Sequence, residues 1–148
     1  MFSKSTEYSI RAIIFLALRA NSDKLIGTTD IARELDFPEA FLGKVLQNIV
    51  KKGLVVSVKG PGGGFYINNN TYELSILDIV EKLEGLGFLS KCGLGLHSCD
   101  DNNPCPIHNE YQFVNTKIRE ALSSKSIRII KQDIAAGNYS MQFDLITP

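Results

Sequence analysis

The strongest indication of the fold lies in residues 28–67, which read TTDIARELDFPEAFLGKVLQNIVKKGLVVSVKGPGGGFYI. A short helix is expected to begin here, with Thr28 as its N-cap and Asp30 at the positive end of the helix dipole. After a tight turn, Pro38 fits the first turn of a second helix that runs to Lys52, and Gly53 is placed to end it. Two short helices joined in this way predict a helix-turn-helix motif.

The second helix has two chemically different faces. Leu42, Val45, Leu46 and Ile49 recur at i, i+3, i+4 and i+7, which predicts a stripe facing the core. The opposite face carries Glu39, Ala40, Gly43, Lys44, Gln47 and Lys51. Small residues on this face permit close approach to DNA, and the polar side chains there, with Asn48, offer donors and acceptors. The pattern predicts a recognition helix for the major groove.

A β-hairpin is expected to follow, with strands at residues 54–59 and 65–67 joined by a Gly-Pro-Gly-Gly-Gly tip. Such a tip can lie along the DNA backbone or in the minor groove, and Lys59 at its base suits a phosphate contact. Because the GxxxxGK[ST] pattern is absent, a phosphate-binding loop is not predicted. Helix-turn-helix and hairpin together predict a winged helix, a fold that also serves as a protein-interaction module.

The chain has 148 residues and 44% hydrophobic content, enough for one core. The first helix, about Thr6–Arg19, is apolar on most sides and is expected to be buried. No apolar run reaches the roughly 18 residues of a membrane span, and Arg11 and Arg19 interrupt the N-terminal one. We therefore expect a cytoplasmic protein with no membrane partner.

The net charge of the chain is zero, but the charges are unevenly distributed. Residues 1–67 carry nine Lys and Arg against six Asp and Glu, and residues 68–148 carry seven Lys and Arg against ten Asp and Glu. This asymmetry permits nucleic-acid binding by the first half of the chain without requiring it.

Further helices are expected in the second half of the chain. One starts at Ser75, where SILD resembles a capping box with Asp78. A long helix is predicted over Asn109–Ser123, and a shorter one over Ser126–Ala136 that ends at Gly137. Tyr111, Val114, Ile118 and Leu122 are expected to lie along one side of the long helix. The fold class predicted is therefore mainly α with a small β-hairpin.

All three cysteines of the chain lie in CGLGLHSCDDNNPCPIH, residues 92–108, together with His108. Thiolates bind soft metals, and imidazole is an adequate fourth donor. In the cytoplasm, clustered cysteines more often indicate metal or redox chemistry than disulfides. Zinc fits a set of three cysteines and one histidine, although the spacing is wider than that of zinc knuckles. Asp100 and Asp101 are expected to solvate the loop.

Four segments resemble the IscR/NsrR family of bacterial transcription regulators. They are STEYSIRA (residues 5–12), the helix pair, the KGPGGGF wing and the three-cysteine loop, and the resemblance extends from Phe2 to about Gly137. It implies a winged-helix homodimer that binds palindromic DNA, with Asn109–Ser123 as the dimerisation helix. It also implies groove contacts from Ala40, Gly43, Lys44 and Lys59. An acidic residue often replaces Gly43 in the iron–sulfur-assembly branch, so the operator is left open.

The resemblance also implies an iron–sulfur cluster, 2Fe-2S or 4Fe-4S, bound by Cys92, Cys99 and Cys105. Its fourth ligand is either His108, as in the IscR branch, or Glu7 of the partner subunit, as in the NsrR branch. The IscR histidine follows the last cysteine by three residues, as His108 does here. Glu7 stands in a TEY triplet similar to the TDY triplet of the NsrR branch.

These features predict a non-enzymatic DNA-binding regulator in three parts. Residues 1–84 form the winged helix-turn-helix, residues 85–108 the cluster loop, and residues 109–148 the dimerisation helix and tail. Operator affinity would be controlled by a cluster that senses nitric oxide, redox state or iron–sulfur status. A zinc- or thiol-based regulator and an iron–sulfur electron carrier are the alternatives. The predicted DNA-binding residues are Thr28, Thr29, Pro38, Glu39, Ala40, Gly43, Lys44, Gln47, Asn48, Lys59, Gly60, Pro61, Gly62, Gly63 and Gly64.

Overall fold

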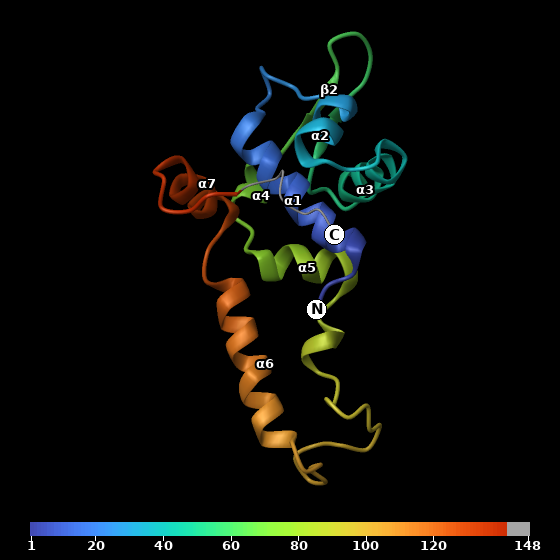
Figure 1. Cartoon of the computed structure of the whole chain (residues 1–148), viewed down its shortest axis with the longest axis vertical. Helices are drawn as coiled ribbons and strands as arrows, with labels where there is room; N and C mark the ends of the chain where they lie inside the picture. The colour runs from blue at the N-terminus through green and yellow to red at the C-terminus, as the bar shows by residue number, and fades with distance from the viewer. Residues whose placement is uncertain (142–148) are drawn as a thin grey trace.

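A computed structural model describes residues 1–141 as a helical head from which a long arm extends (Figure 1). The predicted tail at residues 142–148 lies outside the described residues. The elements are α1 (Lys4–Arg19), α2 (Thr28–Leu35), α3 (Glu39–Lys51), β1 (Val56–Val58), β2 (Gly64–Tyr66), α4 (Asn69–Tyr72), α5 (Ile76–Glu84), the 3-10 turn η1 (Gly87–Leu89), α6 (His108–Ser123) and α7 (Ile127–Ala135). The expected fold, mainly α with one two-stranded antiparallel hairpin, is confirmed.

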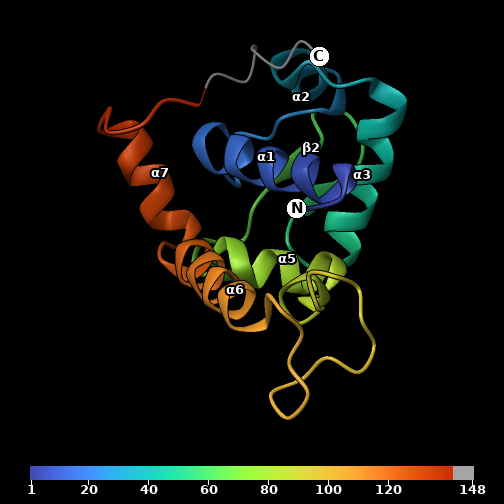
Figure 2. The same cartoon turned by 60° about the horizontal axis from the view of Figure 1, so that its bottom comes forward.

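Helix α1 forms the centre of the head. Its residues from Ala12 to Ala17 are all buried, and α2, α3, α5 and α7 pack around it (Figure 2). The helix begins at Lys4, two residues earlier than expected, because the Ser3 hydroxyl accepts a hydrogen bond from the Thr6 N–H at 3.2 Å and caps it.

The helix-turn-helix forms as predicted, with two changes at the helix starts. Gly27, and not Thr28, is the N-cap of α2, because Gly27 has extended backbone angles while Thr28 is already helical. Pro38 stands one position before the first turn of α3, as its N-cap, and its carbonyl accepts from the N–H of Leu42.

The core stripe of α3 is buried as predicted, at Leu42, Val45, Leu46 and Ile49. Gly53 ends the helix with a φ of +72°. The N–H of Gly53 donates to Val50 and that of Leu54 donates to Ile49, the bonding pattern of a Schellman motif.

The first hairpin strand is shorter than predicted, and the second begins one residue earlier, at Gly64. Val56 pairs with Tyr66 and Val58 with Gly64, whereas Leu54 and Val55 are buried in the core and do not pair with β2. Ile26, in the connection between α1 and α2, pairs with Phe65 on the other edge of β2 through two backbone hydrogen bonds. The hairpin is therefore anchored to the segment that leads into the helix-turn-helix.

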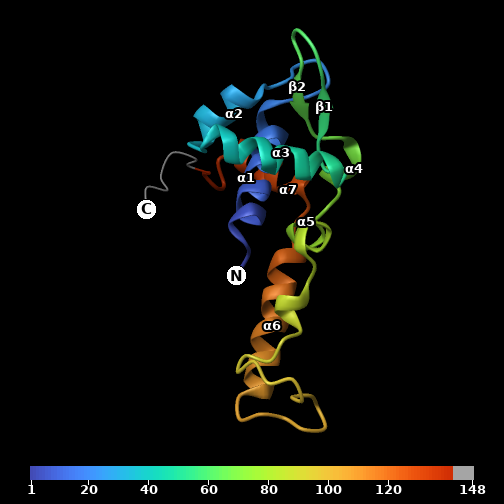
Figure 3. The same cartoon turned by 90° about the vertical axis from the view of Figure 1, so that its right-hand side faces the viewer.

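The arm consists of α6 and the cysteine loop, which run side by side away from the head (Figure 3). Helix α5 packs on α6 at the base of the arm. The N-terminus of α5 has the predicted capping box between Ser75 and Asp78. Of the predicted stripe on α6, Tyr111, Ile118 and Leu122 are half-buried, whereas Val114 is 50% exposed.

The remaining differences are local. Helix α6 begins one residue before Asn109, and Ser126 is the N-cap of α7 and not its first residue. Helix α4 and the η1 turn were not predicted, since runs of four and three residues are too short to show periodicity. Within residues 1–141, no helix is both long and apolar enough to cross a lipid bilayer.

Candidate metal centre and nucleic-acid interface

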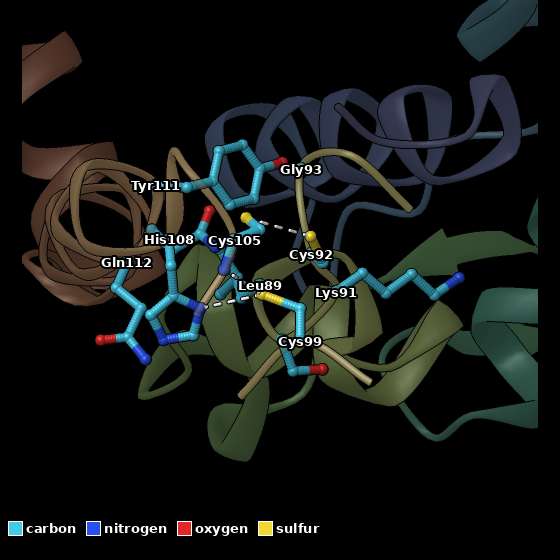
Figure 4. Close-up of a pocket in the computed structure, with 11 residues that line it drawn as sticks. Leu89, Lys91, Cys92, Gly93, Cys99, Cys105, His108, Tyr111 and Gln112 are labelled. Atoms are coloured by element: carbon cyan, nitrogen blue, oxygen red, sulfur yellow. Dashed lines mark hydrogen bonds between the residues drawn. The ribbon is translucent and has the colours of Figure 1, made fainter. Parts of the chain in front are cut away.

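The three cysteine side chains converge at the end of the arm (Figure 4). Their sulfur atoms all lie within 4.8 Å of one another, and the Cys92 and Cys105 sulfurs are 3.7 Å apart. All three are free thiols and half-buried. The six- and five-residue gaps between them are taken up by loops that return to one point. The cysteine spacing, which was wider than that of a zinc knuckle, is therefore compatible with one shared site.

Backbone groups of the loop point at the sulfurs. The N–H groups of Leu96 and Leu94 lower the pKa of Cys92 to about 7 because they stabilise its thiolate. The Cys105 N–H has the same effect on Cys99. Burial and hydrogen bonding to the neighbouring thiols outweigh it and raise the pKa of Cys99 to about 11. The first negative charge thus settles on Cys92, and Cys99 keeps its proton until a cation binds beside it.

His108 is the first residue of α6, and its N–H donates to the Cys105 carbonyl at 3.0 Å. This turn brings the imidazole to the sulfurs, with Nδ1 at 3.1 Å from the Cys99 sulfur. On the far side of the ring, Nε2 lies 3.0 Å from a carboxylate oxygen of Asp101. Asp101 was expected only to solvate the loop, so its contact with His108 is a finding of the structure. No sequence pattern marked it.

A cavity of about 260 Å³ opens beside the sulfurs and is lined by all three cysteines, His108 and Tyr111. Gly93 forms part of its wall. A Cβ at Gly93 would come within 2.8 Å of the Tyr111 ring, so the loop approaches α6 closely only because this residue has no side chain. Glu7, by contrast, is on α1 in the head and pairs with Lys4 of the same helix at 3.0 Å.

The predicted DNA-binding residues gather at the other end of the molecule. A groove of about 450 Å³ between α3 and the hairpin is lined by Thr28, Gly43, Gln47 and Lys59, which come from three different elements. Lys51 and Ser57 also line it and were absent from the predicted set. Thr29, Pro38, Glu39, Ala40 and Lys44 are exposed nearby in sequence, and Asn48 is half-buried.

The hairpin tip is a tight turn closed by a hydrogen bond from the Gly63 N–H to the Gly60 carbonyl at 2.9 Å. Gly60 and Gly62 have φ angles of +94° and +73°, which favour glycine. A Cβ at Gly63 would lie 2.2 Å from the Val58 carbonyl oxygen. The geometry of the turn therefore requires glycine at these positions. The absence of bulky side chains at the tip is a second consequence.

Helix-turn-helix, anchored wing and exposed recognition face define a winged-helix protein of the transcription-regulator class. The chain belongs to the Rrf2 family, whose model, described as "Iron-dependent Transcriptional regulator", matches residues 2–133. Members of this family are transcription regulators that bind DNA and are not enzymes, so the electron-carrier alternative is set aside.

Individual relatives agree with this assignment. The chain is 32% identical over 130 residues to an HTH-type transcriptional regulator of Aquifex aeolicus, covering 86% of this chain and 89% of the relative. It is 24% identical to IscR of Vibrio cholerae over 126 residues, covering 85% and 72%. In fold it is similar to CymR, the global cysteine regulator of B. subtilis (TM-score 0.73, 20% identity, 89% and 96% covered). It is also similar to T. potens IscR (TM-score 0.71, 21% identity, 95% and 93% covered).

Proposed function

We propose that this Rrf2-family regulator is a homodimer whose affinity for a palindromic operator is controlled by an iron–sulfur cluster bound to Cys92, Cys99 and Cys105. The observation that carries the proposal is the convergence of three free thiols, from a 14-residue span, on one point beside a cavity. The arrangement of charges agrees with it, since Cys92 loses its proton near neutral pH and is ready to bind a cation.

The donor set suits a soft metal. Two thiolates bound to the same tetrahedral metal, each about 2.3 Å from it, lie roughly 3.8 Å apart, and the Cys92 and Cys105 sulfurs are separated by 3.7 Å. This separation fits either a shared zinc ion or a shared iron atom of a cluster. The adjoining cavity of about 260 Å³ is several times the roughly 30 Å³ of one water. It has room for a multi-atom cluster as well as for a single zinc ion, and the family description, "Iron-dependent Transcriptional regulator", favours iron. When bound, the cluster supplies a redox-active centre open to nitric oxide, oxygen or loss of iron.

DNA recognition is assigned to the groove between α3 and the hairpin. Gln47 and Lys44 on α3 would meet base edges and phosphates in the major groove, and Ala40 and Gly43 would allow the helix to approach closely. Lys59 and the tip from Gly60 to Gly64 would contact the backbone or minor groove. Thr28, Thr29, Pro38, Glu39 and Asn48 complete the proposed surface.

Dimerisation is assigned to α6, in the third part of the chain. None of its residues is buried in the single chain, and Phe113 and Val114 are 64% and 50% exposed. Exposed apolar side chains of this size on one helix are typical of a contact surface. Two copies related by a two-fold axis would place their recognition helices to read an inverted repeat.

The cysteine loop lies at the opposite end of the molecule from the wing (Figure 3), so any influence on DNA must pass through the head. Near the base of the arm, the η1 turn and α5 contact the N-terminus of α1. Phe88, just before the loop, stacks edge-on against Phe2 with ring centroids 5.7 Å apart. Glu84, the last residue of α5, accepts a hydrogen bond from the Thr6 hydroxyl at 2.7 Å. We assign to these contacts the transmission of loop order to α1, and so to the DNA-reading helices.

Replacing Glu84 with glutamine is expected to weaken this link. Partial burial raises the pKa of Glu84, but the hydrogen bonds from Ser3 and Thr6 outweigh burial and hold it below 4.5. Because the pKa of Glu84 is lower in the folded than in the unfolded protein, its carboxylate stabilises the fold above pH 4.5. This stabilisation is lost as the pH falls through the pKa that Glu84 has in the folded protein. Glu84→Gln should remove this pH dependence, which amounts to about 1 kcal/mol at most at such an accessible site.

The functional measurement for Glu84→Gln is the ratio of operator affinities of cluster-loaded and apo protein, which should move toward one. Glu81→Gln on the exposed side of the same helix is the matched control. An unchanged ratio in Glu84→Gln would contradict the proposed path.

The proposed function is tested by anaerobic purification followed by absorption spectroscopy, iron and sulfide analysis, and DNA binding at fixed salt. The DNA is a palindrome selected from a random library by the protein itself. We expect a brown protein whose operator affinity changes at least tenfold when the cluster is removed. A colourless protein with one zinc per chain would establish the zinc alternative. Equal affinity of apo and loaded dimer would overturn the sensing proposal.

A further inference from the structure

The histidine of the sulfur site is held by two residues outside the predicted ligand set. One carboxylate oxygen of Asp101 lies 3.0 Å from His108 Nε2 and also accepts a hydrogen bond from the Gln112 side-chain amide at 2.8 Å. Gln112 is on α6, one turn after His108, so the helix fixes Asp101 and Asp101 in turn fixes the imidazole.

The environment of the ring is asymmetric. The His108 side chain is 11% exposed, whereas that of Asp101 is 82% exposed and reaches it from the solvent side. The Asp101 side chain faces solvent, and an ionised carboxylate can only accept hydrogen bonds. The proton of a neutral imidazole must therefore be on Nε2, and Nδ1, 3.1 Å from the Cys99 sulfur, keeps its lone pair.

We propose that Asp101 and Gln112 are positioning residues that hold His108 with Nδ1 as its metal-binding atom, and that His108, rather than Glu7 of the partner subunit, completes the site. This inference rests on the proposed cysteine site but concerns a different residue set. A carboxylate behind a ligating histidine fixes its tautomer and orientation and raises its basicity, and removing such a partner typically weakens the site by about 10- to 100-fold.

The location of His108 supports the choice. Its Nδ1 already lies in contact with one of the three sulfurs, and the residue lines the same cavity.

The first test uses the full-length apo protein. Long-range ¹H–¹⁵N spectra of ¹⁵N-histidine-labelled protein at neutral pH should show His108 protonated on Nε2. In Asp101→Asn, a carboxylate no longer selects this tautomer, and the Nδ1-protonated form should rise several-fold. Glu110→Gln removes the same charge from the first turn of α6 without touching His108, and it should leave the tautomer as in wild type. Wild-type protein protonated on Nδ1 would overturn the proposal whether or not a cluster binds.

The second test uses the loaded protein. Pulsed EPR of the reduced cluster should show strong ¹⁵N hyperfine coupling that His108→Ala abolishes and Glu7→Gln leaves intact. Asp101→Asn and Gln112→Leu should keep the cluster but shorten its lifetime in air, by about 10- to 100-fold for Asp101→Asn. Gln112→Leu removes the hydrogen bond that holds Asp101 and leaves the Asp101 carboxylate and His108 in the chain, so it provides a second variant should Asp101→Asn disturb the loop.

The outcomes of the two tests separate the proposals. Failure of wild type to bind a cluster would overturn the proposed function and leave the tautomer measurement to decide the role of Asp101. A cluster that shows no nitrogen coupling would overturn the assignment of His108 as a ligand but not the proposed function. The same holds if Glu7→Gln, and not His108→Ala, loses the cluster.

Discussion

Replacing Cys105 with serine should abolish the cluster and fix operator affinity at its apo value. Cys105 is central to the site: its sulfur is 3.7 Å from that of Cys92, its N–H donates to the Cys99 sulfur, and its carbonyl accepts from His108. The substitution keeps the backbone contacts and replaces a soft thiolate by a hydroxyl, which is a poor ligand for iron or zinc. We expect bound iron and visible absorption to fall by roughly 100-fold or more, beyond the loss typical for an outer-shell partner.

The control for Cys105→Ser is Ser98→Ala, which changes an exposed side chain of the same loop. It should keep the spectrum and the difference in DNA affinity between loaded and apo protein. Far-UV circular dichroism should be unchanged in both variants, because the core lies in the head, away from the cysteine loop. If Cys105→Ser retained a wild-type spectrum, Cys105 would not be a ligand.

Gly63→Ala should distort the wing and lower operator affinity by at least about tenfold, equivalent to roughly 1.4 kcal/mol. A Cβ here would lie 2.2 Å from the Val58 carbonyl and 2.8 Å from the Gly60 carbonyl, and both are backbone atoms that move only if the turn opens. The strain of accommodating it is about 1–3 kcal/mol. Since Gly63 N–H closes the turn, an opened tip would also displace Lys59 at the base.

The measurement for Gly63→Ala is DNA binding across a salt series, because displacement of a phosphate contact lowers the salt slope as well as the affinity. Gly87→Ala is the matched control, since a Cβ there meets only the end of the Lys91 side chain at 3.9 Å. Wild-type affinity and salt slope in Gly63→Ala would show that the wing does not contact DNA.

The fold of the head was readable from local patterns. The four-residue stripe on α3, the stop at Gly53 and the capping box at Ser75 each depend on residues within one or two helical turns, and all three are observed. The helix starts at Gly27 and Pro38 were each misplaced by one residue. Cap position depends on backbone angles that neighbouring side chains specify only loosely.

The sequence by itself determined the winged helix and the placement of every cysteine in one loop, because periodicity, caps and ligand types are local properties. It also supplied the residues that we propose for the DNA-reading face. Only the tertiary structure decided which donors meet. Three features depend on how an irregular loop folds against α6. They are the approach of Gly93 to Tyr111, the convergence of the three sulfurs, and the contact of Asp101 with His108 and Gln112. Loop paths are set by such non-local contacts, which leave no periodic pattern in the sequence.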